Sequence, residues 1–475
     1  MNEVRSFSFQ QELRDVQFGD RRLNSRAAAI LGQMYESSEL PTNARVKSWA
    51  EAMGTYRFFG NAKVGAQAMI EGHQYRILER AKDEQELTVA NDTTSVSYTT
   101  HINTTGMGPI SNGSSAGATS KSKAATRAQG LFIHTAEVFN SSGVPIGILG
   151  QEIWARGKKT GVSSREQESQ RWSRVIRLAS DLQNELPNAK VYCVGDRESD
   201  SDENIRLGQE LGVRVIVRAK AKMRAAKEQG LKLLDQLLSM PAEETFEIEL
   251  RDNNAARKRW NECNWRRDRQ VRFTRTASLE IRYQAITTRK GLDAWAVLVN
   301  EPNPPKNVEP INWLLLSAFP VSSIEDARKV VEVYRQRWGI EIFHKVLKSG
   351  CRIKECRFDS FEKIKKYLTA ASLVAWRLQM LTMLARENPN ESCDEVLTEN
   401  EWRTLQAVTG KRITQTPPTL EEATLMIARL GGHFNRKSDS PPGVQTMWRG
   451  WQRLSDMTAA VLAMSESKAE LVYNR

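Results

Sequence analysis

The chain has 475 residues with 69 Lys and Arg against 57 Asp and Glu, and its formal net charge of +12 favours a polyanionic partner such as nucleic acid. A hydrophobic fraction of 40% with 27% charged residues is ordinary for a globular protein and excludes an intrinsically disordered chain. No run approaches the ~18 apolar residues of a membrane helix, and the five cysteines form no C-x-x-C pair. We therefore expect a cytoplasmic protein without a membrane segment, a disulfide framework or a zinc module.

The first 70 residues are predicted to form short helices. Asp20 can cap a helix whose apolar positions recur at helical spacing, namely Leu23, Ala27, Ile30, Leu31 and Met34. Arg21, Arg22 and Arg26 lie on or beside the polar face, where they could follow a phosphate backbone. A solvated helix face is the alternative interpretation.

From about residue 87 the pattern changes to strands. The run LTVAND ends at Asp92, and residues 131–139 and 144–154 read as a hairpin joined through Asn140–Gly143. A helix over about 166–186, the strand AKVYCVG before Asp196, a helix from about 202 and the strand VRVIVRAK follow. Meandering strands followed by alternating helices and strands predict a mixed sheet covered by helices.

The stretch of about 220–310 is rich in β-type segments and interrupts this alternation. Residues 214–290 hold 19 Lys and Arg against 10 Asp and Glu, so 19 − 10 = +9 of the net charge falls in this part. The strand INWLLLSAF, a long helix over about 323–350 and an all-helical remainder follow. An apolar face on the last helix suits a core or a partner helix; its positions are Trp448, Trp451, Leu454, Met457 and Val461.

Two aspartates follow predicted strands, and a third carboxylate lies on the long helix. Asp92 and Asp196 are expected at the carboxyl edge of a sheet, where catalytic groups gather, although aspartates at strand ends also serve as turn residues. Any metal should be bound by carboxylates, which suit hard cations such as Mg²⁺ or Mn²⁺.

The long helix carries a polar stripe at spacings of 3, 4 and 7 residues. Its members are Tyr334, Arg337, Glu341 and Lys348. A phenol, a guanidinium, a carboxylate and an ammonium on one helix face suit an anionic substrate bridged by metal. A surface ladder of ion pairs, with Arg337 bonded to Glu341, would produce the same spacing.

These motifs together resemble the DDE transposases of the insertion-sequence-four family, and within it the Tn-five branch. The resemblance rests on DTTSVSY from Asp92, DRESD from Asp196, and the Y-R-E-K signature formed by the stripe. Further similarity lies at GTYRFFGN (54–61), VIVRAK (215–220), NWLLL (312–316) and IARLGG (427–432), so that it spans about residues 10 to 455.

The resemblance implies an α/β fold, with an RNase H-like catalytic core interrupted by a β-rich insertion. It implies a helical domain over 1–70 that binds transposon ends, a catalytic domain over 71–365 with the insertion at about 220–310, and a helical dimerisation domain over 366–475. Asp92, Asp196 and Glu341 would be the metal-binding triad. The implied activity is cut-and-paste transposition through a DNA hairpin.

The remaining site residues are also implied by the resemblance. Two Mg²⁺ ions, with Mn²⁺ as substitute, would serve each active site, and Tyr334, Arg337 and Lys348 would complete the catalytic set. Trp313 matches the family's base-stacking tryptophan, although an aromatic residue in an apolar strand normally packs in a core. The expected DNA contacts are Arg22, Arg26, Arg57, Arg218, Lys220 and Trp313. The basic pair near Arg22 is displaced by one position from the family pattern, so a different end sequence is expected.

The implied partners are double-stranded DNA, both as terminal inverted repeats and as target, and a second copy of the chain, in a bacterial protein associated with the nucleoid. Two alternatives stay open. An RNase H-like nuclease or resolvase would cut DNA without joining it. A catalytically silent DNA-binding inhibitor would bind the ends without cutting them.

Overall fold

The computed structural model describes nine ranges of the chain, with gaps between them. The described residues are 9–37, 40–46, 48–110, 128–157, 164–220, 232–251, 274–305, 310–436 and 441–473. The chain divides into two compact units. Unit 1 comprises Met1–Arg171, Glu185–Ala189 and Trp338–Arg475, and unit 2 comprises Trp172–Asn184 and Lys190–Arg337.

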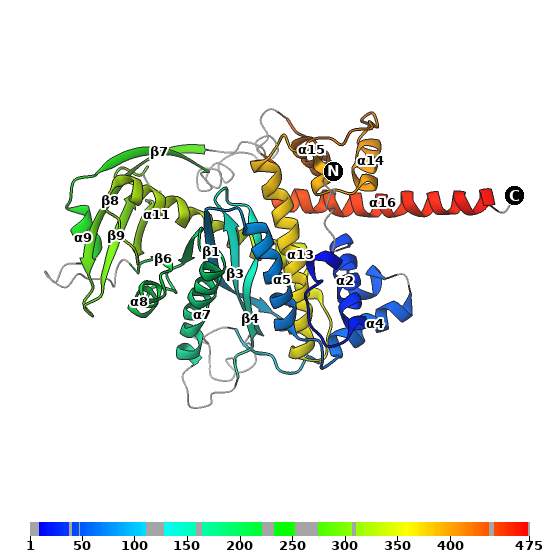
Figure 1. The fold of residues 1–475 in the computed structure, drawn as a ribbon, viewed down its shortest axis with the longest axis horizontal. Helices are drawn as coiled ribbons and strands as arrows, with labels where there is room; N and C mark the ends of the chain where they lie inside the picture. The colour runs from blue at the N-terminus through cyan, green and yellow to red at the C-terminus, as the bar shows by residue number, and fades with distance from the viewer. Residues whose placement is uncertain are drawn as a thin grey trace, which may run out of the picture. The chain divides into compact units, whose positions relative to one another are not determined.

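Five helices form the N-terminal part of unit 1 (Figure 1), as the sequence predicted. They are α1 (Phe9–Glu12), α2 (Arg21–Glu36), α3 (Thr42–Arg45), α4 (Trp49–Gly60) and α5 (Ala66–Ala81). The predicted cap is present, because the Asp20 side chain accepts a hydrogen bond from the Arg22 N–H at 2.9 Å. Ala27, Ile30, Leu31 and Met34 are buried, which confirms the predicted core face of α2 from Ala27 onwards, whereas Leu23 is half-buried.

The sheet of unit 1 contains the predicted hairpin. Its strands are β1 (Glu86–Ser97), β2 (Gly108–Pro109), β3 (Gln129–Asn140) and β4 (Pro145–Trp154), and β3 pairs antiparallel with each of the others. The prediction that the first strand ends at Asp92 was wrong. β1 continues to Ser97 because its last residues pair with β3 as far as Gly130, so Asp92 lies within the strand, opposite Thr135.

Helix α13 (Phe361–Glu387) packs against β4 and α5, and Figure 1 shows α5 and α13 running beside the strands of unit 1. Its core residues include Leu373, Val374 and Trp376. Within the described ranges, α13 is the one helix long and apolar enough to cross a membrane, and 83% of its most apolar window is buried inside the protein.

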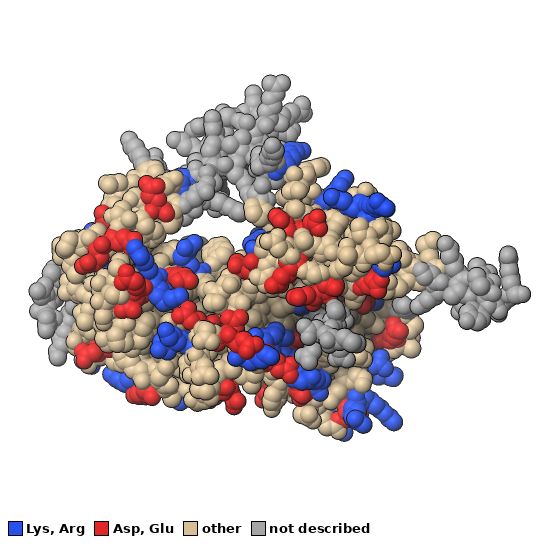
Figure 2. All heavy atoms as spheres, turned by 45° about the horizontal axis from the view of Figure 1, so that its top comes forward, with Lys and Arg blue, Asp and Glu red and all other residues tan. Residues whose placement is uncertain are grey.

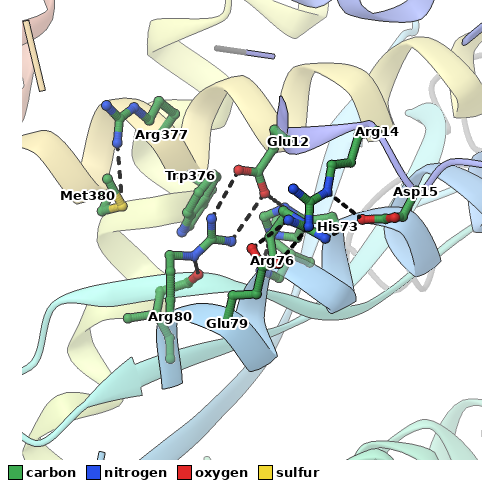
Figure 3. A network of polar contacts seen from close by, with 12 residues as sticks. Glu12, Arg14, Asp15, His73, Arg76, Glu79, Arg80, Trp376, Arg377 and Met380 are labelled. Atoms are coloured by element: carbon green, nitrogen blue, oxygen red, sulfur yellow. Dashed lines mark hydrogen bonds and ion pairs between the residues drawn. The ribbon is translucent and has the colours of Figure 1, made fainter. Parts of the chain in front are cut away.

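A buried polar network ties α1 to α5 (Figure 3). Arg80 donates to both carboxylate oxygens of Glu12, at 3.0 and 3.1 Å, and its guanidinium lies 4.6 Å from the centroid of the Trp376 ring. His73 Nε2 accepts the Ile148 N–H at 2.9 Å, so the ring proton resides on Nδ1 and is donated to Glu12. Burial lowers the pKa of His73, which agrees with a neutral ring. The network therefore joins α1, α5, β4 and α13.

Unit 2 begins with the predicted alternation of helices and strands. Its first elements are α7 (Ser164–Glu185, shared with unit 1), β5 (Lys190–Gly195), α8 (Asp202–Leu211) and β6 (Arg214–Arg218). β5 and β6 are parallel, and α8 packs on β6. Gly212 ends α8 with φ of 69°, a left-handed conformation that favours glycine.

The predicted β-rich insertion is present and extends the sheet of unit 2. It contains α9 (Leu233–Leu238), β7 (Glu244–Arg251), β8 (Thr274–Thr287) and β9 (Asp293–Asn300), and β10 (Asn312–Ser317) follows it. The strand order is β5-β6-β10-β9-β8-β7, with every pair beyond β6 antiparallel. Because β10 lies between β6 and β9, the chain returns from the insertion to the edge of the α/β strands.

The predicted single helix over 323–350 is three consecutive elements. α11 (Ile324–Gln336) ends before Arg337, α12 (Trp338–Lys345) follows, and Val346–Gly350 form a π-helix. A π-helical turn adds one residue to the turn and changes the side-chain direction after it. Lys348 therefore does not continue the regular stripe that the sequence suggested.

The chain beyond α13 is helical, as predicted. The helices are α14 (Glu399–Val408), α15 (Leu420–Leu430) and α16 (Val444–Tyr473), and capping boxes begin α14 and α15. The apolar face of α16 is divided. Trp448, Trp451 and Leu454 are buried, whereas Met457 and Val461 are 36% and 46% exposed, so this end offers an apolar surface to a partner.

Candidate active site and DNA-binding surfaces

Asp92 lies on β1, within a polar environment of unit 1. Its side chain is 22% exposed, and its Oδ1 accepts the Thr93 N–H at 2.8 Å. The Oδ2 atom lies 3.8 Å from Nδ1 of His344, a buried residue of α12. This contact connects two segments that are 344 − 92 = 252 residues apart in the sequence. The fold thus places the helix that carries Glu341 beside Asp92.

Helix α12 approaches the sheet closely because it has a glycine at the contact. A Cβ atom on Gly339 would lie 2.4 Å from the ring of Phe139 on β3, so no larger residue fits without displacement. α12 also packs on β1. Glu341 is in the first turn of this helix and is half-buried.

Lys348 is half-buried in the π-helix that follows α12. Burial lowers the pKa of its ammonium, the positive charge of Lys354 lowers it further, and the carboxylate of Asp92 opposes both effects. The Asp92 charge therefore acts on Lys348. Unit 1 brings together Asp92, the helix of Glu341, and Lys348.

Asp196 follows β5 in unit 2. Its Oδ1 accepts the Glu198 N–H at 2.8 Å, which is a turn of the kind considered as its alternative role. The second carboxylate oxygen does not take part in that bond. Because Gly195 on β5 is paired with Val217 on β6, Asp196 and Arg218 follow at the same end of two parallel strands.

The two predicted basic contacts of unit 2 differ in exposure. Arg218 is half-buried and donates from Nη2 to the carbonyl of Asn312 at 3.0 Å. The side chain of Lys220 is exposed, and its backbone N–H donates to Asp200 at 2.8 Å. This bond holds Arg218 against Asn312, the residue directly before Trp313 on β10.

Trp313 and Tyr334 contact each other across β10 and α11. Their ring centroids are 5.8 Å apart with an interplanar angle of 63°, an edge-to-face arrangement. Tyr334 is buried and its hydroxyl completes no hydrogen bond among the described residues. The guanidinium of Arg337 lies 5.9 Å from the Tyr334 ring centroid. Trp313 is half-buried, so it is neither a fully enclosed core residue nor a surface one.

The two units divide the proposed catalytic set between them. Unit 1 carries Asp92, Glu341 and Lys348, and unit 2 carries Asp196 together with the cluster around Trp313. Within the described part of the chain, no three His, Cys, Asp or Glu side chains are grouped as in a metal site. The donor chemistry nevertheless fits a divalent hard cation, because all three candidate ligands are carboxylates.

The N-terminal arginines form an exposed basic surface on two helices. Arg22 and Arg26 are one turn apart on α2, and Arg57 is exposed on α4. Nη1 of Arg26 lies against Gly54, at 3.2 Å from the position that a Cβ there would take. Gly54 precedes Arg57 by about one turn of α4. The fold therefore gathers these three arginines on neighbouring turns of α2 and α4.

The basic stretch of residues 214–290 falls largely outside the described residues. Ten of its 19 basic and four of its 10 acidic residues lie in 221–231 and 252–273, so 10 − 4 = +6 of its +9 is located there. On the face shown in Figure 2, basic and acidic side chains of the described residues are interspersed. The support for DNA binding by this stretch is therefore the charge of its sequence.

Two residues beside the site were not assigned a role from the sequence. His344 has no distinguishing signal in the sequence, because only the tertiary contact with Asp92 separates it from a packing residue. Trp338, three residues before Glu341, is 62% exposed although it is a large aromatic residue. The sequence signal that could have identified Trp338 is its position between Arg337 and Glu341, within the polar stripe.

Comparison with protein families identifies three consecutive regions. Residues 7–64 match the family described as transposase DNA-binding, 167–377 match the transposase DDE domain, and 373–470 match the transposase Tn5 dimerisation domain. The architecture is thus an N-terminal helical DNA-binding domain, an RNase H-like α/β core with a β-rich insertion, and a C-terminal helical dimerisation domain. A DDE domain performs DNA cleavage and strand transfer with divalent metal ions. The chain is a DNA-binding, dimerising enzyme of the Tn5-like DDE transposase family.

Proposed function

We propose that the protein catalyses cut-and-paste transposition, in which a DNA hairpin forms at each transposon end before the ends are joined to target DNA. The observation that carries the proposal is the contact between α12 and β1. His344, three residues after Glu341, lies 3.8 Å from the carboxylate of Asp92. Two carboxylates of the signature are therefore held on neighbouring elements, although the sequence separates them widely.

In the proposed site Asp92, Asp196 and Glu341 would hold two Mg²⁺ ions, for which Mn²⁺ would substitute. When bound, such ions would activate the attacking oxygen and stabilise the departing one. The protein residues supply position and charge around the phosphodiester. Arg337 would hold a phosphate through two N–H donors, and Lys348 would add a point charge.

The Tyr334 hydroxyl is suited to a phosphate oxygen. It is buried and completes no hydrogen bond among the described residues, so an incoming acceptor would satisfy it. Its ring is fixed from one side by Trp313. The phenol thus has a defined orientation before the substrate arrives.

Trp313 is the proposed stacking partner for a base that leaves the duplex during hairpin formation. Moving one nucleotide out of the stack costs a few kcal/mol, which an aromatic face can offset. The indole is in edge-to-face contact with Tyr334, and its side chain is half-buried. Arg218 is bonded to Asn312, the residue before Trp313, and would bind the neighbouring DNA backbone.

End recognition is proposed for Arg22, Arg26 and Arg57, with Arg218 and Lys220 binding DNA near the cleavage point. The proposed domain limits are 1–70, 71–365 and 366–475, with the insertion at about 220–310. A protein of this activity would act on the chromosome, so we place it with the bacterial nucleoid.

Cleavage and joining are tested with duplexes carrying the inverted repeats that flank the coding region. Alanine at Asp92, Asp196 or Glu341 should abolish Mg²⁺-dependent cleavage and leave end binding intact. Undiminished cleavage in any of the three would remove that residue from the site. Products that are cut but never joined to target would favour a nuclease or resolvase, and binding without cleavage by the wild type would favour an inhibitor.

The hairpin step is tested separately with Trp313→Ala. The variant should nick the transposon end at the wild-type rate and accumulate nicked DNA in place of hairpins. Leu314→Ala, which truncates a buried side chain at the next position of the same strand, is the control for general damage to β10. An unchanged hairpin yield in Trp313→Ala would show that Trp313 is a packing residue and does not stack on the base.

A further inference from the structure

A glutamine and a glutamate are enclosed together under α12. Gln379 on α13 and Glu137 on β3 are both 0% exposed. The Gln379 amide donates from Nε2 to the carbonyl of Gly339 at 3.0 Å, in the first turn of α12. Gly339 is two residues before Glu341 and is the residue that packs on Phe139. The backbone of the Glu341 helix is therefore held from α13 by one side chain.

The orientation of the Gln379 amide follows from its partner. A carbonyl oxygen only accepts hydrogen bonds, so the NH₂ group must face Gly339 and Oε1 must point elsewhere. The carboxyl group of Glu137 lies close enough to the Gln379 side chain for the amide to lower the pKa of Glu137. Among the described residues, neither Oε1 of Gln379 nor either oxygen of Glu137 completes a hydrogen bond in the structure.

Three oxygen atoms of this pair lack a donor, and a proton on Glu137 supplies one. An ionised carboxylate that is buried without a charged partner is costly. A protonated Glu137 would donate to Oε1 of Gln379. Burial raises the pKa of Glu137 well above its usual range and outweighs the lowering effect of the Gln379 amide, which supports a neutral carboxyl group.

We propose that Gln379 is a positioning residue that fixes the Glu341 helix through Gly339, and that Glu137 acts as a neutral donor which orients Gln379. The inference rests on the proposed role of Glu341 as a metal ligand. We call Glu137 and Gln379 together the relay. Glu137 lies in the middle of β3, opposite Ala90 of β1 and Ile148 of β4, so the relay begins at the centre of the sheet. The relay thus connects the strand next to Asp92 with the helix of Glu341.

The first test replaces Gln379 by Met, which keeps the volume and removes the hydrogen bonds. Cleavage at saturating DNA should fall about 10- to 100-fold, as for partners that orient metal ligands, and the Mg²⁺ concentration for half-maximal rate should rise. End binding should stay unchanged. Thr382→Val is the matched control, because Thr382 is buried on the same helix and bonds only the carbonyl of Leu378.

The second test compares Glu137→Gln with Glu137→Met. A glutamine amide can donate to Gln379 as a protonated acid does, so Glu137→Gln should cleave like the wild type, whereas Glu137→Met should resemble Gln379→Met. Equal impairment of both Glu137 variants would overturn the neutral-donor role. A wild-type rate and Mg²⁺ dependence in Gln379→Met would overturn the positioning role.

If the Met variants do not fold, an infrared measurement tests the protonation of Glu137 instead. At neutral pH, the difference spectrum between the wild type and Glu137→Gln should contain the carbonyl band of a protonated carboxyl group, and absence of this band would refute the inference. Glu341→Ala distinguishes a failure of the proposed active site from a failure of the relay. If it cleaves normally, the proposed site fails; if it is inactive while Gln379→Met is normal, only the relay fails.

Discussion

Replacing Glu12 by Gln removes one negative charge from the buried network of Figure 3. Burial by itself would raise the pKa of this carboxyl, but His73 and Arg80 outweigh it and lower the pKa from 4.5 to about 2. At about 1.4 kcal/mol per pKa unit, the ionised form stabilises the fold by at most about 3 kcal/mol, because the neutral His73 ring contributes a hydrogen bond and no charge. Because the pKa in the folded state is depressed, this stabilisation is complete above pH 4.5 and is lost as the pH falls towards 2.

Hydrogen exchange of the amides in α1 and α5 measures this stabilisation locally, without global unfolding of a chain that has several domains. At pH 7, Glu12→Gln should increase the exchange rates of these amides about 100-fold relative to the wild type at the same pH. At pH 3 the remaining contribution is about 1 kcal/mol, so the ratio should shrink to about 10-fold or less.

Glu79→Gln is the matched control. Glu79 is on the same helix and pairs with Arg14 and Arg76, but its side chain is 47% exposed. Partly exposed ion pairs contribute about 0–1 kcal/mol, so exchange should change little. Equal exchange in Glu12→Gln and the wild type at pH 7, or a ratio that stays constant down to pH 3, would refute the reasoning.

Three further predictions concern the helix of Glu341, the N-terminal surface and the dimer. Gly339→Ala should slow cleavage, because its Cβ would lie 2.4 Å from the Phe139 ring and overpacking costs about 1–3 kcal/mol; added Phe139→Leu should restore part of the rate, and failure to do so would show that the clash is not the cause. Arg26→Ala and Arg57→Ala should each reduce the salt dependence of end binding by about one unit of slope if each arginine binds a phosphate, as measured by titration at several salt concentrations. An unchanged slope would mean that the arginine does not contact the backbone. Val461→Lys should weaken the homodimer in sedimentation experiments, because Val461 lies in the exposed apolar part of α16; undiminished dimerisation would place the interface elsewhere.

Local patterns in the sequence were sufficient for most elements of the fold. The cap at Asp20, the buried face of α2 and the hairpin of β3 and β4 were predicted from spacing and turn chemistry, which act over a few residues. The end of β1 was wrong because strand length depends on the partner. Residues 93–97 belong to the strand only because β3 pairs with them. The break after Gln336 and the π-helix at Val346 likewise have no periodic signal in the sequence.

The sequence by itself determined the class of chemistry: carboxylates in place of His or Cys ligands, a polar stripe around Glu341, and motifs of one transposase family. Those properties belong to residue types and their order along the chain. Only the tertiary structure decided that His344 lies beside Asp92, that Gln379 holds the Glu341 helix, and that the apolar face of α16 is half core and half exposed. These facts depend on contacts between segments far apart in the chain, and such contacts are set by packing, which no local pattern encodes.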